Sequence, residues 1–103
     1  PNQKFYYQNR GIAKGNLKDF RGAIKDFDKA IALDPKFALA YAKRGLAKIA
    51  LGQKDSGCLD LSKAGELGIT DAYDMISKYC QWIKQQSKLS IILQHFYLKK
   101  DCF

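Results

Sequence analysis

Residues 7–17 read YQNRGIAKGNL, and residues 41–51 read YAKRGLAKIAL. Six of these eleven positions are identical, among them Arg10/Arg44 and Gly11/Gly45. The same offset aligns four further identical pairs: Asp26/Asp60, Lys29/Lys63, Ala30/Ala64 and Leu33/Leu67. Chance does not place ten identities, glycine and charges included, in one such window. The offset, about 34 residues, indicates a repeat architecture, so the two segments are expected to build the same local structure.

Each repeated segment contains two stretches with apolar residues at helical spacing, separated by a polar turn. We expect an all-α chain with helices near residues 4–17, 20–33, 37–51, 54–67 and 71–86. Asp19 is placed to cap the second helix, and the Asp34-Pro35 pair to end it, because the residue before proline avoids the α region. Gly52 and Gly68 are placed as left-handed C-cap residues.

The signature positions resemble those of the tetratricopeptide repeat, a helix–turn–helix unit of about 34 residues. They hold Tyr7, Gly11, Phe20, Ala23, Phe27, Ala30 and Pro35 in the first repeat, and Tyr41, Gly45, Gly57, Leu61 and Ala64 in the second. Gly57 replaces the usual alanine and Ile69 the usual proline, so the second repeat is somewhat degenerate. The repeats are similar to a bacterial-type variety that reads NRGxAK, as in residues 9–14.

The resemblance covers Lys4 to about Gln81 and implies a solenoid of about two and a half repeats. Residues 1–86 would hold the repeats, at 4–37, 38–71 and a partial third at 72–86. Residues 87–103 would form a C-terminal capping, extension or exchanged helix. We expect Gly11 and Gly45 to let paired helices approach closely, against Ala23 and Gly57.

Composition bounds the class of protein. The chain has 103 residues, is 47% hydrophobic and 27% charged, and carries a net charge of +8. It is therefore expected to fold, and its charge favours anionic partners by long-range attraction. No apolar run approaches the ~20 residues that span a bilayer, and no signal peptide is visible. We expect a cytoplasmic protein, unless a signal peptide has been removed.

The three cysteines, Cys58, Cys80 and Cys102, are odd in number and form no C-x-x-C pair. We therefore expect buried or semi-buried thiols in a reducing compartment rather than a disulfide. The sole histidine, His95, cannot supply a metal cluster, and the scattered acids form no acid–base pair. The sequence predicts neither an enzyme nor a metal or cofactor site.

The resemblance implies that the first helix of each repeat lines a concave groove. The groove-facing places fall on Phe5, Gln8, Ile12, Gly15 and Asn16 in the first repeat, on Leu39, Ala42, Leu46, Ile49 and Ala50 in the second, and on Tyr73, Ile76, Cys80 and Ile83 in the third. This face is mostly aliphatic and aromatic, so it would either dock an amphipathic helix or apolar peptide, or be covered by a C-terminal segment. The clamp with which some family members grip acidic chaperone tails is absent, because its places read Gln8, Ile12, Lys43, Tyr73 and Ser77.

Charge also repeats, in a predicted basic stripe of five residues: Arg10, Lys14, Arg44, Lys48 and Lys78. One interpretation pairs Arg10 with Asp26 and Arg44 with Asp60, which share the period. The other leaves the stripe open to a polyanion. We favour pairing for the arginines and expect the lysines to be solvated and available to an anionic partner.

These observations predict a non-catalytic scaffold that binds a protein or peptide partner. The alternatives are a self-assembling module and a basic module for nucleic acid or another polyanion. Nucleic acid is disfavoured because no RNA-binding signature is present. Residues 89–98, LSIILQHFYL, form an apolar run that must cover something. We expect them to be helical and to bury Ile92 or Phe96, and we expect a homodimer through residues 87–103 slightly more than a monomer.

Overall fold

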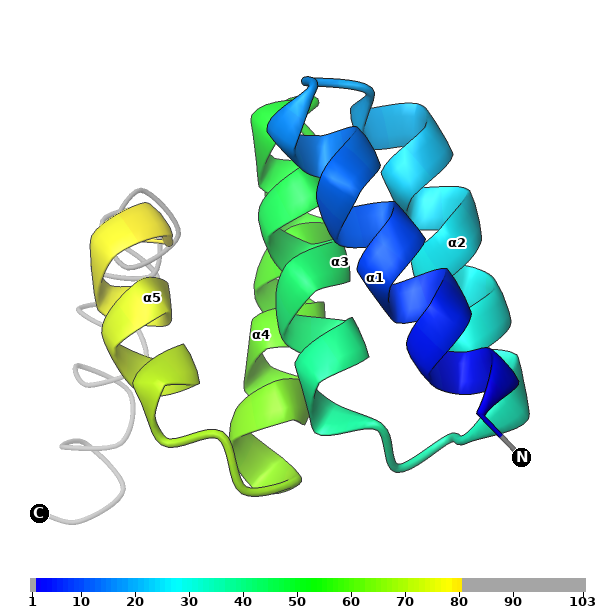
Figure 1. Ribbon diagram of the computed structural model, residues 1–103. Helices are drawn as coiled ribbons and strands as arrows, with labels where there is room; N and C mark the ends of the chain where they lie inside the picture. Colours follow the sequence, from blue (N-terminus) through cyan, green and yellow to red (C-terminus); the bar gives the residue numbers. More distant parts are fainter. Residues whose placement is uncertain (1, 81–103) are drawn as a thin grey trace, which may run out of the picture.

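The computed structural model describes residues 2–80, and these fold into five helices with no strand among them. The helices are α1 (Gln3–Asn16), α2 (Phe20–Leu33), α3 (Ala38–Ala50), α4 (Lys54–Glu66) and α5 (Asp71–Tyr79). Helices α1 and α2 form one antiparallel pair and α3 and α4 a second, and the pairs stack through α2 and α3 (Figure 1). The expected all-α helical solenoid is confirmed.

The predicted boundaries of the first four helices hold to within one residue. The fifth helix ends at Tyr79, and the remainder of its predicted span lies outside the described residues. The extension at 87–103 and the apolar run at 89–98 also lie outside them. The expectation that the apolar run covers other apolar surface, and the expectation of an exchanged helix, therefore stay predictions.

Local signals end the helices where the sequence indicates. The Asp19 side chain accepts a hydrogen bond of 3.1 Å from the Gly22 N–H at the start of α2. Asp34, at the end of α2, has an extended backbone with φ −144°, as expected before proline. Gly52 and Gly68 follow α3 and α4 with φ of 86° and 114°, in the left-handed region that glycine tolerates.

Lys18 occupies in the first repeat the place that Gly52 occupies in the second. It too has a positive φ, 65°. The turns are alike in hydrogen bonding, since the N–H of Asp19 donates to the Lys14 carbonyl and that of Gln53 to the Lys48 carbonyl, both at 2.8 Å. The repeat thus imposes a left-handed turn on a lysine, which costs conformational energy.

The two glycines expected at helix contacts behave differently. A Cβ on Gly45 would lie 2.7 Å from the Gly57 carbonyl oxygen, so α3 and α4 touch backbone to backbone as predicted. A Cβ on Gly11 would instead meet the ring of Phe27, at 2.6 Å. The nearest neighbour of Gly11 is therefore the Phe27 ring rather than the expected Ala23, and Ala23 lies 4.0 Å from a Cβ placed on Gly15.

The core is built from small residues in two clusters. The first contains Ala23, Phe27 and Ala47, with Ile12, Phe20 and Ile24 packed against it. The second contains Ala42, Cys58, Leu61, Ala64, Ala72 and Cys80. Small side chains let the helices of a short solenoid approach closely, which is why alanine is the commonest residue in both clusters.

A disulfide joins Cys58 on α4 to Cys80 at the end of α5. The expectation of unpaired thiols is therefore wrong. Cys58 is on the face of α4 that carries Leu61, and Cys80 follows Ile76 by one turn on α5, so both lie in the second core cluster. Packing of α5 on α4 brings the two sulfurs together, although the spacing of 22 residues matches no familiar disulfide motif.

Candidate functional site

An apolar pocket of about 190 Å³ opens between α1 and α3, with α2 behind it. Residues from the three helices line it: Gly11, Ile12, Gly15, Asn16, Phe20, Phe27, Lys43, Leu46 and Ala47. We call it the α1–α3 pocket. It lies on the first helices of the two repeats, where the groove was predicted, and α2 supplies two phenylalanines that the prediction did not include.

The structure brings only part of the predicted groove into this pocket. Ile12, Gly15, Asn16 and Leu46 line it, and Ile83 lies outside the described residues. Gln8, Ala42 and Cys80 are buried, so they form core rather than an open surface. Ile49 and Ile76 are half-buried and pack against the second core cluster. Neighbouring helices therefore cover several places that a simple carry-over of family positions would leave open.

Three large apolar residues of the predicted groove stay exposed and occupy the same place in successive repeats: Phe5, Leu39 and Tyr73, with exposed fractions of 48%, 41% and 53%. Each lies in the first turn of its helix. The Phe5 ring meets that of Phe37 edge-on at 5.6 Å. The Tyr73 ring lies over Gly65 on α4. These three side chains form an apolar row apart from the α1–α3 pocket.

Gln8 is the unexpected polar residue of this region. Its exposed fraction is 2%, and in the described part of the chain neither atom of its amide has a hydrogen-bond partner. Such a buried amide ordinarily binds an ordered water or another polar group. Gln8 precedes Gly11 and Ile12 by one helical turn, so it lies next to the pocket lining.

The repeated arginines pair as expected. Arg10 donates from Nε and Nη2 to the two Asp26 oxygens, at 2.9 and 2.7 Å. Arg44 makes the same two bonds to Asp60, each 2.8 Å long. Both aspartates are buried. The arginines therefore join the two helices of each repeat and are not free cations.

Two of the three lysines of the stripe, Lys14 and Lys48, are also paired, so their predicted availability is wrong. Lys14 Nζ lies 3.2 Å from Asp26 and Lys48 Nζ lies 3.0 Å from Asp60. Each lysine follows its arginine by four residues, on the same helix face, and so reaches the same carboxylate. Hydrogen bonds from Arg10, aided by Lys14, hold the pKa of Asp26 below its ordinary 3.8, although burial acts the other way.

The two arginines differ in their third bond. Arg44 Nη1 donates to Asp28 on α2 at 2.8 Å, which links the first repeat to the second. Arg10 Nη1 donates instead to the Tyr6 hydroxyl at 2.9 Å. Hydrogen bonds to Asp60 and then Asp28 raise the pKa of Arg44, and those to Asp26 do the same for Arg10.

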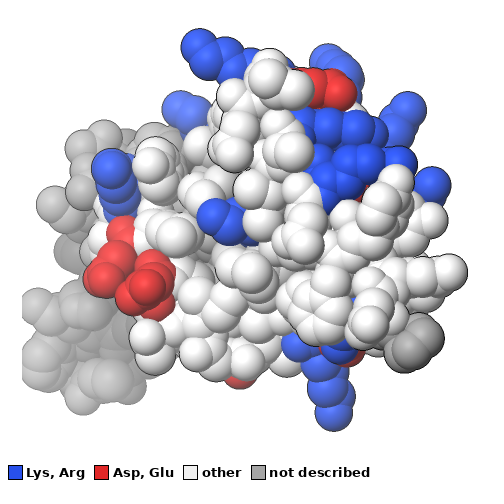
Figure 2. Space-filling view, viewed as in Figure 1, with Lys and Arg blue, Asp and Glu red and all other residues white. Residues whose placement is uncertain are grey.

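The last member of the predicted stripe, Lys78, lies over the Tyr79 ring at 5.3 Å and makes no ion pair within residues 2–80. Figure 2 shows Lys and Arg side chains gathered at the upper right, where Figure 1 has the C-terminal half of α1 and the adjoining part of α2. Acidic side chains lie at the left, near the start of α5, whose first turn carries Asp71 and Asp74.

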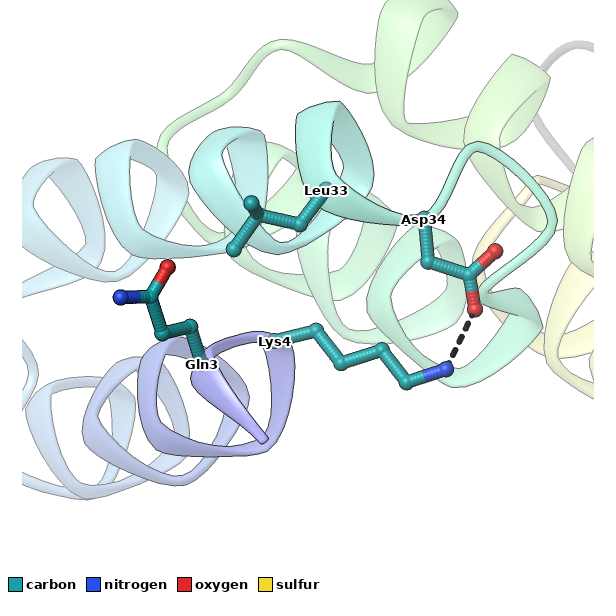
Figure 3. A pocket seen from close by; sticks show the side chains of 4 residues that line it. All are labelled: Gln3, Lys4, Leu33 and Asp34. Atoms are coloured by element: carbon teal, nitrogen blue, oxygen red, sulfur yellow. Dashed lines mark hydrogen bonds and ion pairs between the residues drawn. The ribbon is translucent and has the colours of Figure 1, made fainter. Parts of the chain in front are cut away.

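A second hollow, of about 330 Å³, lies where α1 begins and α2 ends (Figure 3). Gln3, Lys4, Leu33 and Asp34 line it, and Lys4 Nζ contacts Asp34 at 2.8 Å. The Lys4 ammonium also lies 5.1 Å from the Phe5 ring centroid. Lys4, and then the Lys36 N–H, lower the pKa of Asp34. Because Lys4 and Asp34 neutralise each other, neither leaves an unpaired charge in this hollow for a ligand.

Within residues 2–80 no group of three histidine, cysteine or acidic residues could hold a metal ion. The same residues contain no helix long and apolar enough to cross a membrane.

Comparison with known proteins places the repeat. A sequence profile described as "Tetratricopeptide repeat" matches residues 5–37. The first repeat therefore matches the tetratricopeptide repeat. A solenoid of tetratricopeptide repeats presents an extended surface to partners, so this match supports a protein-interaction module.

The chain is also similar to three larger proteins. The chain is 28% identical over 94 residues to "Small glutamine-rich tetratricopeptide repeat-containing protein 2" of Saccharomyces cerevisiae, covering 91% of this chain. It is 38% identical over 61 residues to "Protein STIP1 homolog" of Dictyostelium discoideum, covering 59% of this chain. It is 38% identical over 63 residues to "RNA polymerase II-associated protein 3" of Xenopus tropicalis, covering 61%. The matches cover 27%, 11% and 10% of these relatives' own lengths.

Proposed function

We propose that this tetratricopeptide-repeat chain is a non-catalytic module that binds a peptide or helix of a partner protein in the α1–α3 pocket. The observation that carries the proposal is the pocket itself, with Ile12, Leu46 and two phenylalanines around it. Its volume of about 190 Å³ suits one large side chain rather than a drug-sized ligand, which needs roughly 300 Å³ or more. The partner would therefore insert a single apolar anchor.

Lys43 gives the pocket a charge preference. Its half-buried side chain lines the pocket and makes no ion pair or hydrogen bond within residues 2–80. A carboxylate placed beside the apolar anchor would complement that ammonium. We therefore propose a partner segment in which leucine or a similar residue is flanked by acidic residues.

A labelled peptide tests the proposal directly. The probe is a fluorescein-labelled hexapeptide with two leucines between two pairs of glutamates, and the measurement is fluorescence anisotropy against the intact chain. We expect saturable binding, and at least about tenfold weaker binding when serines replace the leucines. Equal binding of the leucine and serine peptides would contradict an apolar anchor.

Two charge reversals locate the site. Lys43→Glu is expected to weaken probe binding by about fivefold or more, because a like charge then faces the glutamates. Lys25→Glu, on the exposed side of α2, changes the net charge equally and is expected to change binding less than about twofold. If the two variants bind the probe equally, the pocket is not the site.

The polyanion alternative has less support, because four members of the basic stripe are held by Asp26 and Asp60. It predicts affinity that falls steeply with salt concentration. Self-assembly through residues 87–103 stays a separate prediction. Light scattering on the intact chain and on a chain ending at Gln86 tests it, and a monomer in both cases would exclude it.

A further inference from the structure

The Cys58–Cys80 disulfide ties α5 to α4, and residues 2–80 otherwise bury little of this helix. Of residues 71–80 only Ala72 and Cys80 are buried, and Met75 and Ile76 are half-buried. Helix α5 has nine residues, and isolated helices shorter than about 12 residues are marginal in water. Within residues 2–80, its position therefore depends on its contacts with α4 and on the disulfide.

The surface beneath α5 is apolar and reaches the proposed binding pocket. Ala72, Cys80, Met75 and Ile76 from α5 belong to one cluster with Ala42, Leu61 and Ala64, and Leu46 and Ile49 of α3 pack against it. Leu46 also lines the α1–α3 pocket. If α5 leaves, a row of apolar residues on α3 and α4 continuous with that pocket meets water.

We propose that the Cys58–Cys80 disulfide is a redox lock, which seats α5 on α3 and α4 and, when reduced, uncovers this apolar surface. A dithiol supplies the chemistry. Its thiolate attacks one sulfur to give a mixed disulfide, and its second thiol then displaces that cysteine. The S–S bond between Cys58 and Cys80 becomes two thiols, while the dithiol loses two electrons and two protons and becomes a cyclic disulfide.

The expected strength of the lock follows from the loop it closes. The bonded cysteines are 22 residues apart. Closing a loop of that size covalently is expected to shift the equilibrium between seated and released α5 toward the seated form, by on the order of 100-fold. Both cysteines are buried, at 8% and 5% exposure, so a reductant must wait for α5 to open. The bond forms in an oxidising compartment, and the unlocked form belongs to a reducing one.

Hydrogen exchange tests the lock without any binding partner. The sample is the 103-residue chain with Cys102→Ser, which leaves Cys58 and Cys80 as its only cysteines. On adding dithiothreitol, we expect the α5 amides to exchange at least about tenfold faster and those of α1 to stay unchanged. A dye that fluoresces on exposed apolar surface should brighten at the same time.

The double variant Cys58→Ser/Cys80→Ser is the matched control. It should show fast α5 exchange with and without dithiothreitol, which separates loss of the bond from other effects of the reductant. Equal α5 exchange in the oxidised and reduced chains would overturn the lock. Equal acceleration in α1 would also overturn it, because reduction would then unfold the whole domain. Alkylation of both cysteines in the air-oxidised, denatured chain would overturn it as well, because the disulfide would not have formed. Peptide binding enters none of these readouts, so failure of the proposed function would be seen separately.

Discussion

Arg44 on α3 donates two hydrogen bonds to the buried carboxylate of Asp60 on α4 and a third to the exposed carboxylate of Asp28 on α2. The same guanidinium thus joins the two helices of its own repeat and reaches back to the repeat before. The bonds to the buried and the exposed aspartate have the same length of 2.8 Å. We therefore expect burial, and not bond length, to decide how much each bond contributes to the free energy of unfolding.

We expect Asp60→Asn to lower the free energy of unfolding by about 1–3 kcal/mol, because a buried charged acceptor is lost and the new amide N–H₂ faces Arg44 and Lys48. Asp28→Asn removes the negative charge that faces the same guanidinium, at a side chain that is 53% exposed. Its cost should stay below about 1 kcal/mol. Urea unfolding followed by circular dichroism measures both, and equal costs would show that burial does not control these bonds.

Asp26 gives the fold a predicted sensitivity to acid. Its pKa lies below the ordinary 3.8 in the folded chain, so near that pH the unfolded chain binds more protons than the folded one. The stabilisation is complete above the unfolded value and is lost as the pH falls through the folded value. Urea unfolding from about pH 6 to about pH 2 should show this loss, and Asp26→Asn should flatten it. An unchanged slope in that variant would contradict the assignment to Asp26.

Gly45 and Gly15 test two kinds of glycine in the first helices of the repeats. A Cβ at Gly45 would strike the Gly57 carbonyl oxygen, so Gly45→Ala should push α3 from α4 and cost about 1–3 kcal/mol. A Cβ at Gly15 would meet only the Ala23 methyl, at 4.0 Å. Gly15→Ala should therefore stabilise the chain by up to about 1 kcal/mol, since alanine is the better helix former. Thermal melting of both variants checks the opposite signs.

Lys18 has a left-handed backbone conformation, and the equivalent position of the second repeat is a glycine, Gly52. Lys18→Gly should raise the free energy of unfolding by about 0.5–1 kcal/mol, because the left-handed strain is relieved and part of the gain is offset by chain entropy. The reciprocal change, Gly52→Lys, should destabilise the chain by about 1 kcal/mol. Denaturant unfolding of the pair decides the matter, and a loss of stability in Lys18→Gly would show that the turn depends on the lysine side chain.

The repeat period made the helices and the arginine–aspartate pairs predictable. Arg10, Arg44, Asp26 and Asp60 occupy the same places in each repeat, and opposite charges at repeated positions favour repeated contacts. The pairing of Lys14 and Lys48 was missed because the lysines of the stripe were expected to be solvated. Their spacing of four residues from the arginines was the signal that could have found it.

The disulfide and the extent of the pocket were harder to predict. Cys58 and Cys80 have no periodic partner, and Cys102 made the count odd. Their places beside Leu61 and Ile76, on inward faces of adjacent helices, were the available signal. Gln8 and Ala42 were assigned to an open groove because family positions say which way a residue faces. They do not say how closely the neighbouring helix packs.

The Cys58–Cys80 bond also determines how the chain responds to mechanical tension. A force that pulls on the two ends passes through the S–S bond and bypasses residues 59–79. Fully unravelled, the oxidised chain would therefore be shorter than the reduced chain by roughly 65–75 Å, the extended length of 22 residues less the 6.2 Å that the bond itself spans between the Cα atoms. Because Arg10 and Asp26 both lie outside the bypassed segment, the first repeat would extend under load while α5 stays shielded from it.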